Sequence, residues 1–111
     1  MIDQIERSIR QSKEVSECGN AIKRLRNNTD FKTVILSGYF EKEAIRLVHL
    51  KADQNMQSPA IQQSIVSQID AIGSLSQYLD VVLFKADLAE KTLIADQETV
   101  EQLAAEELAH G

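Results

Sequence analysis

Apolar residues recur at helical spacing along more than thirty consecutive residues, and this pattern constrains the fold more than any other feature. It begins after Ser58 and Pro59, a pair typical of a helix N-cap followed by the first helical residue. Its members are Ile61, Ile65, Ile69, Ile72, Leu75, Leu79, Val82 or Leu83, Ala86 and Leu93. A helix of this length is roughly 50 Å long. We predict one long spine helix over about residues 59–94, with Gly73 as the place for a bend.

The first part of the chain also has a helical period, but a narrower apolar stripe. Residues spaced three and four apart between charges are Ile2, Ile5, Ile9, Val15, Cys18, Ile22 and Leu25. A stripe this narrow is nearly a heptad pattern and suits coiled-coil packing against one or two other helices. Cys18 is expected to be a small core residue. The sequence "NNTD", residues 27–30, favours the end of this helix and the start of the next.

The second helix is predicted from Phe31 onward, although the β-branched residues 33–35 also tolerate an extended conformation. Gly38 offers a C-terminal turn or kink. After it, residues 40–52 are apolar except for one polar face, and a helix this widely apolar must be covered on two sides. We expect this segment at the centre of the fold. The stretch "DQNMQSP", residues 53–59, is the predicted loop before the spine helix.

These patterns predict an all-α fold with three to four helices, arranged as a helical hairpin or a small bundle. A chain of 111 residues supports one domain, which we place at residues 1–95. Residues 96–111 form an acidic C-terminal helix or tail, with three large apolar residues to bury, Val100, Leu103 and Leu108. An isolated helix of this length is marginal in water, so this segment either docks on a partner or frays.

Charge and composition exclude several classes of function. The net charge is −5, and it is unevenly distributed: residues 1–28 carry six basic and four acidic side chains, and residues 86–111 carry one basic and seven acidic. An acidic chain is poorly suited to nucleic acid, because phosphate binding depends on Lys and Arg. One cysteine makes no internal disulfide, and no apolar run or leader pattern indicates a membrane span or secretion. We expect a soluble protein made in a cytoplasm.

Motifs for catalysis or metal binding are missing from the sequence. Cys18, His49 and His110 lie far apart in different predicted elements, without the paired spacing of a metal site. The chain has no glycine-rich phosphate loop, serine elbow or helical Glu-x-x-His pair. The sequence therefore predicts neither an enzyme nor a bound cofactor or metal.

Two groups of residues are candidates for binding a protein partner. Lys23, Arg24 and Arg26 cluster near the predicted end of the first helix, where the helix dipole alone favours cations, and where an acidic partner would also bind. In "SGYFEKEAIRL", residues 37–47, Tyr39 and Arg46 are candidate anchors, because Tyr and Arg are enriched in binding hot spots.

The same stretch is also explained as a simple helix corner. Gly38 would then turn the chain, Phe40 would fill the core and Tyr39 would lie half-buried with its hydroxyl in water. Glu43 would pair with Arg46 three residues on. Both interpretations stay open from sequence.

Residues 27–53 contain an Asn-x-Asp-Phe pattern, Gly-Tyr-Phe and Glu-Ala-x-Arg-Leu, and they are followed by the Ser-Pro helix start and "AIGSLSQYL". With these motifs the chain resembles small uncharacterised proteins encoded among the virion-morphogenesis genes of tailed bacteriophages. The resemblance covers about half the chain and brings no catalytic residues. It implies a virion component or an assembly factor rather than an enzyme.

The expected function is therefore that of a bacteriophage virion structural or head-assembly protein that acts through protein–protein contacts. Its partners would be the capsid, the portal or itself, with a homo-oligomer expected because the core is small. It would be found in the host cytoplasm during assembly, or in the virion. The alternative is a small acidic phage protein that inhibits a host factor by presenting carboxylates where nucleic-acid phosphates would bind.

Overall fold

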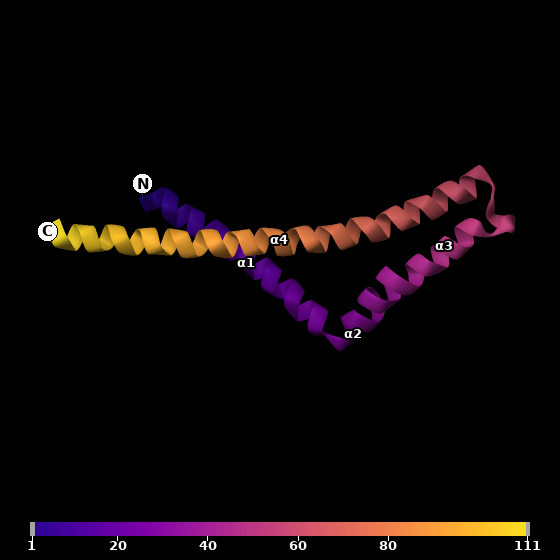
Figure 1. Ribbon diagram of the computed structural model, residues 1–111, viewed down its shortest axis with the longest axis horizontal. Helices are drawn as coiled ribbons and strands as arrows, with labels where there is room; N and C mark the ends of the chain where they lie inside the picture. The colour runs from indigo at the N-terminus through magenta and orange to yellow at the C-terminus, as the bar shows by residue number, and fades with distance from the viewer. Residues whose placement is uncertain (1, 111) are drawn as a thin grey trace. The chain divides into compact units, whose positions relative to one another are not determined.

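The computed structural model describes residues 2–110, and within that range every element is helical (Figure 1). The elements are α1 (Ile2–Asn27), α2 (Thr29–Phe31), η1 (Lys32–Glu43), α3 (Ala44–Ala52), η2 (Gln54–Met56) and α4 (Pro59–His110). Because α2, η1 and α3 follow one another without a break, they form one continuous helix between α1 and α4. The predicted all-α fold with a long spine helix is confirmed.

The spine helix α4 is longer than predicted, with 52 residues, and it passes through Gly73 without a break. Its inward side chains recur every seventh residue: Ile65, Ile72, Leu79 and Ala86 are buried, and Leu93 and Val100 are half-buried. A strict heptad repeat is typical of helices that supercoil around a partner. The helix does not end near residue 94, because Val100 and Leu103 continue the half-buried side and no Gly or Pro interrupts it.

The chain divides into two compact units. Unit 1 combines Met1–Ile22 with Val81–Gly111, and unit 2 is Lys23–Asp80. This division differs from the expected one at residue 95, because the C-terminal part of α4 belongs with α1. Each unit is described separately below.

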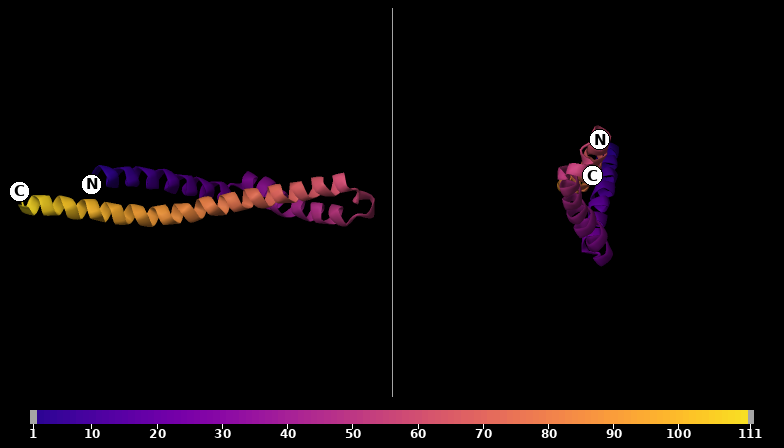
Figure 2. Two further views of the ribbon diagram at one scale, coloured as in Figure 1. Left: turned by 90° about the horizontal axis from the view of Figure 1, so that it is seen from above. Right: turned by 90° about the vertical axis from the view of Figure 1, so that its right-hand side faces the viewer.

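Unit 1 is an antiparallel pair formed by α1 and the second half of α4 (Figure 2). The Ser8 hydroxyl donates a 2.6 Å hydrogen bond to Asp96 Oδ2. Further along the pair, a Cβ placed on Gly19 would lie 2.2 Å from Ala86 Cβ, so the two backbones approach very closely there. Close approach of this kind requires small residues, and two of the three buried residues of α1, Ser12 and Gly19, are small.

The predicted stripe on α1 is therefore wrong at four positions. Ile2, Val15, Cys18 and Leu25 are exposed. The inward side of α1 keeps the predicted Ile5, Ile9 and Ile22 and also carries the small residues Ser12 and Gly19. The prediction weighed apolar character alone, whereas the distance between the helices selects for small size. Cys18 is thus an accessible thiol rather than a core residue.

Unit 2 is a hairpin in which the continuous helix α2–η1–α3 packs against the first half of α4. Its centre is formed by Leu47, Ile65 and Ile72, surrounded by Tyr39, Phe40, Ala44, Leu50, Met56 and Ile69. Leu47 has no exposed surface, whereas Phe40 is only half-buried. The sequence suggested that Phe40 fills the core. In the structure Leu47 fills it instead.

The turn of this hairpin lies where the sequence predicted a loop, at residues 53–59. The Asp53 side chain accepts a hydrogen bond from the Asn55 backbone N–H at 2.8 Å. The Gln62 side-chain amide donates to the carbonyls of Lys51 and Met56, at 3.0 and 2.8 Å. The Ser58 hydroxyl accepts from the Ile61 N–H at 3.4 Å. The predicted Ser-Pro start of α4 is confirmed.

The predicted turn at Gly38 is wrong, because Gly38 lies inside η1, a π-helix of 12 residues. In a π-helix, hydrogen bonds run from residue i to i+5, so side chains four and five apart share a face. This places Phe31, Leu36, Phe40 and Ala44 on one side of the helix, and all four are half-buried. In an α-helix, Phe31 and Phe40 would lie about two and a half turns apart and face opposite ways.

Candidate functional site

The five predicted partner-binding residues all lie in unit 2, but the structure does not gather them into one site. Lys23 and Arg24 are exposed in the last turns of α1 and make no ion pair with any described residue. Arg26 Nη2 instead pairs with Asp80 Oδ1 of α4 at 3.2 Å. The basic cluster is thus divided: Arg26 joins α1 to α4 within unit 2, and Lys23 and Arg24 are available to a partner.

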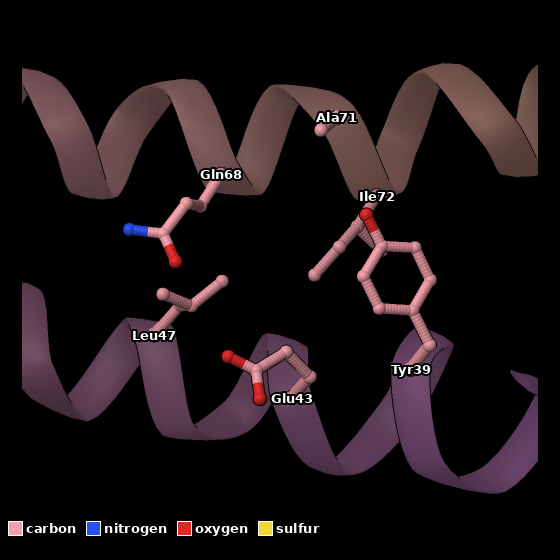
Figure 3. A pocket seen from close by; sticks show the side chains of 6 residues that line it. All are labelled: Tyr39, Glu43, Leu47, Gln68, Ala71 and Ile72. Carbon is pink, nitrogen blue, oxygen red and sulfur yellow. The ribbon is translucent and has the colours of Figure 1, made fainter. Parts of the chain in front are cut away.

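Tyr39 lines a small pocket between the continuous helix and α4 (Figure 3). The pocket has a volume of about 260 Å³ and is lined by Tyr39, Glu43, Leu47, Gln68, Ala71 and Ile72. The Tyr39 hydroxyl is directed toward α4, and the carboxylate of Glu43 and the amide of Gln68 lie on the other side of the pocket. The ring of Tyr39 packs at a tilt beside the ring of Phe40, with 5.9 Å between the ring centroids. Tyr39 is half-buried, as predicted.

Arg46 is held by Glu43 in a two-pronged ion pair, as the sequence predicted. Its Nε donates to Glu43 Oε1 and Oε2 at 3.0 and 3.2 Å, and its Nη2 also donates to Oε1. These hydrogen bonds lower the pKa of Glu43 and raise the pKa of Arg46. Arg46 does not line the pocket beside Tyr39. The two predicted anchors are linked only by Glu43, which lines the pocket with Tyr39 and pairs with Arg46.

Sequence reasoning missed an exposed apolar face on α4 in unit 1. Val81, Phe84 and Leu88 are 46%, 65% and 48% exposed. Their spacing of three and four residues places them on one side of the helix, roughly opposite Ala86, which is buried against Gly19. A groove of about 280 Å³ lies beside this face, lined by residues that include Val15 of α1 and Leu88 and Ala89 of α4. We call Val81, Phe84 and Leu88 the far face of α4.

The signal for the far face was present in the sequence. Residues 81–84 read Val-Val-Leu-Phe, and a helix can bury only some of four consecutive apolar side chains against one neighbour. Only the members that continue the spine stripe, Val82 and Leu83, were assigned there, and these two are half-buried.

A second apolar face is open on α3 in unit 2. Ile45 and Val48 are 58% and 60% exposed, and Ala52 is exposed one turn further on. The prediction that residues 40–52 are covered on two sides is wrong within the single chain. Only the side that carries Leu47 is covered, because unit 2 offers α3 one neighbouring helix. We call Ile45, Val48 and Ala52 the outer face of α3.

Within the part of the chain that the structure describes, no group of three or more His, Cys, Asp or Glu side chains could hold a metal ion. None of the described helices is both long enough and apolar enough to cross a membrane. The chain matches no family model, and comparisons with curated proteins and with solved structures find no similar chain.

Proposed function

We propose that this protein acts through protein–protein contacts, as a structural or assembly component whose helices are completed by helices of other molecules. The observation that supports this most is the far face of α4. In unit 1, α4 packs on α1 with the side that carries Ala86 and presents Phe84 on the other side. A helix that is apolar on opposite sides is normally buried on both.

The energetics favour a partner for both open faces. Burying one large apolar side chain contributes about 1.5–3 kcal/mol. The far face of α4 has three such side chains, and the outer face of α3 has two, Ile45 and Val48. Two antiparallel helices bury only the side of each helix that faces the other, whereas a bundle of four helices also buries further apolar sides. We propose that further copies of this chain supply the missing helices.

The finer assignment rests on the resemblance of residues 27–53 to proteins of phage virion-morphogenesis genes. On that basis we propose a component of a tailed-phage virion or of its head-assembly machinery, with capsid, portal or further copies of the chain as partners. A role that depends on protein contacts alone fits a chain whose helices leave apolar faces uncovered.

A substitution on the far face tests the contact function. Phe84→Glu places a charge where an apolar surface must be buried, so self-association should weaken by at least about tenfold. Gln63→Glu adds the same charge at an exposed position of α4 in unit 2 and serves as the control. Sedimentation velocity of the two variants and the unmodified chain measures the effect. Equal association of Phe84→Glu and Gln63→Glu would rule out the far face as a contact.

Mass spectrometry of purified phage particles tests the virion assignment. A virion protein is retained in washed particles, and an assembly factor is found only in precursor heads. Recovery in neither, combined with capture of a host nucleic-acid-binding protein from infected cells, would favour the inhibitor alternative. The exposed acids Glu98, Glu101 and Glu106 of α4 are the residues that such an inhibitor would use.

A further inference from the structure

We infer that the pocket between the continuous helix and α4 binds a small, uncharged ligand that has an apolar ring at one end and a hydrogen-bond donor at the other. All six residues that line this pocket lie between Tyr39 and Ile72, inside unit 2. The inference goes beyond the proposed contact function, because neither the far face of α4 nor the outer face of α3 lines the pocket.

The volume of the pocket sets the size of the ligand. This volume is about 260 Å³. A cavity of about 150 Å³ is large enough to hold benzene, and pockets for drug-sized molecules begin at about 300 Å³. The pocket therefore suits a molecule with a single ring and a short polar group. Leu47 has no exposed surface and closes the base of the pocket, so such a ligand binds without opening the core.

One end of the pocket is apolar. The ring of Tyr39 forms this end, and the side chain of Ile72 lies next to it (Figure 3). A ligand ring beside Tyr39 would make the offset or edge-to-face contact that aromatic pairs prefer. Ala71 is exposed at the rim, and its small side chain leaves the entrance open. The ring of the ligand is therefore assigned to this end.

The opposite end of the pocket carries hydrogen-bond acceptors, and the first is Gln68. Its Nε2 donates to the carbonyl oxygen and to the hydroxyl of Ser64, at 3.3 and 3.4 Å. Because a carbonyl oxygen only accepts, these contacts fix the orientation of the amide. Gln68 Oε1 then points toward the helix that carries Leu47 (Figure 3). Within the part of the chain that the structure describes, no group donates to this oxygen.

The second acceptor at this end is the carboxylate of Glu43. Arg46 donates twice to Glu43 Oε1 and once, at 3.2 Å, to Oε2. A carboxylate accepts about four hydrogen bonds, so Oε2 has room for one more. The guanidinium of Arg46 balances the charge of Glu43, so a donor without charge fits this end. An anion, which brings acceptors and no donor, does not fit.

Two ligands of the same shape test this inference. Benzamide has a ring and a neutral amide that donates, whereas benzoate has a carboxylate that only accepts. When benzamide is titrated into the full-length chain, the NMR signals of the Gln68 side-chain amide and of the Ile72 methyl groups should shift. Benzoate should bind at least about tenfold more weakly. Equal binding of the two molecules, or no shift with benzamide, would overturn the inference.

Substitutions at the pocket check where benzamide binds. Ala71→Leu fills the entrance from an exposed position and should weaken benzamide binding at least about tenfold. Ala60→Leu is the matched control, because Ala60 is also an exposed alanine of α4 in unit 2 but does not line the pocket. If Ala71→Leu binds benzamide as tightly as Ala60→Leu does, the ligand lies elsewhere and the inference is wrong.

The acceptor is tested by Gln68→Met, which removes the amide and keeps the length of the side chain. This variant should bind benzamide at least about threefold more weakly, as expected for the loss of one hydrogen bond, and benzoate as before. An equal effect on both molecules would contradict a donor-specific site. Circular dichroism of each variant checks that the helices are retained.

A third molecule tests the source of the ring. N-acetyl-tryptophanamide has a ring with an N–H donor on a peptide-like backbone. We expect it to bind no more tightly than benzamide, because the pocket takes a free small molecule. Binding that is tighter by about tenfold would overturn this source in favour of a tryptophan side chain of a partner protein.

Discussion

The contact between Gly19 and Ala86 in unit 1 shows how a single residue sets the distance between two helices. A glycine inside an exposed helix normally costs about 1 kcal/mol relative to alanine. At Gly19 the balance reverses, because a Cβ would lie 2.2 Å from Ala86 Cβ. The helices would have to separate, and overpacking of this kind costs about 1–3 kcal/mol.

We therefore predict that Gly19→Ala lowers the free energy of unfolding. Gly73→Ala is the matched control, because Gly73 also lies in a helix but a Cβ there meets nothing within 4 Å. That change should stabilise the chain by up to about 1 kcal/mol. Urea denaturation of both variants tests the pair. If Gly19→Ala stabilised the chain as much as Gly73→Ala, α1 and α4 would not approach each other closely at Gly19.

Leu47 is the second residue on which we make a prediction. It is fully buried between Ile65 and Ile72, so Leu47→Ala should cost about 2–5 kcal/mol. Phe40 is larger but half-buried, so Phe40→Ala should cost less than the 3–5 kcal/mol typical of a fully buried Phe. Denaturant melts rank the two variants. A larger loss for Phe40→Ala would restore the original expectation that Phe40 fills the core.

The Glu43–Arg46 pair gives a prediction on pH. The hydrogen bonds from Arg46 lower the pKa of Glu43 from its ordinary value of 4.5. The stability that the pair contributes is therefore present above that value and is lost as the pH falls through the lowered pKa. In an NMR titration, Arg46→Ala should move the midpoint of Glu43 upward, toward 4.5. An unchanged midpoint would mean that the ion pair is not formed in solution.

At the scale of elements, the sequence predicted the helices better than their faces. The helical period of α4 and the turn at residues 53–59 could be predicted because both depend on local chemistry, namely periodicity and caps. The close approach at Gly19 could not be predicted from sequence, because it depends on which residue of α4 lies opposite. Val15 and Cys18 fitted an apolar stripe equally well until the neighbouring helix was known.

The π-helix η1 was missed for a different reason. A helix is normally recognised by apolar spacings of three and four residues, and Gly38 was taken as the end of one. The spacings of four and five between Phe31, Leu36, Phe40 and Ala44 were the available signal. Gly38 fits this geometry, since a Cβ there would lie 3.0 Å from the carbonyl oxygen of Thr33, five residues earlier.

The candidate site was predictable in part. The Glu43–Arg46 pair and the half-buried position of Tyr39 follow from local spacing, and both are observed. The pairing of Arg26 with Asp80 is not local, because 54 residues separate the two along the chain. The far face of α4 and the outer face of α3 emerge only when one knows which sides the neighbouring helix leaves uncovered.

At the scale of the whole molecule, each unit consists of helices that cover one another on one side. Both units leave apolar side chains open, Phe84 and its neighbours in unit 1 and Ile45 and Val48 in unit 2. Large exposed apolar surfaces on a chain of this size mark sites of protein contact. We propose that copies of the chain, or a partner protein, cover these faces.

Multi-angle light scattering of the unmodified chain over a dilution series tests this claim most directly. We predict a molar mass that is a multiple of the single-chain mass at high concentration and falls toward one chain on dilution. The fall should come at higher protein concentration when salt is raised or residues 96–111 are removed, because opposite charges contribute to the contact. A single-chain mass at every concentration and salt, unchanged by the truncation, would contradict self-assembly.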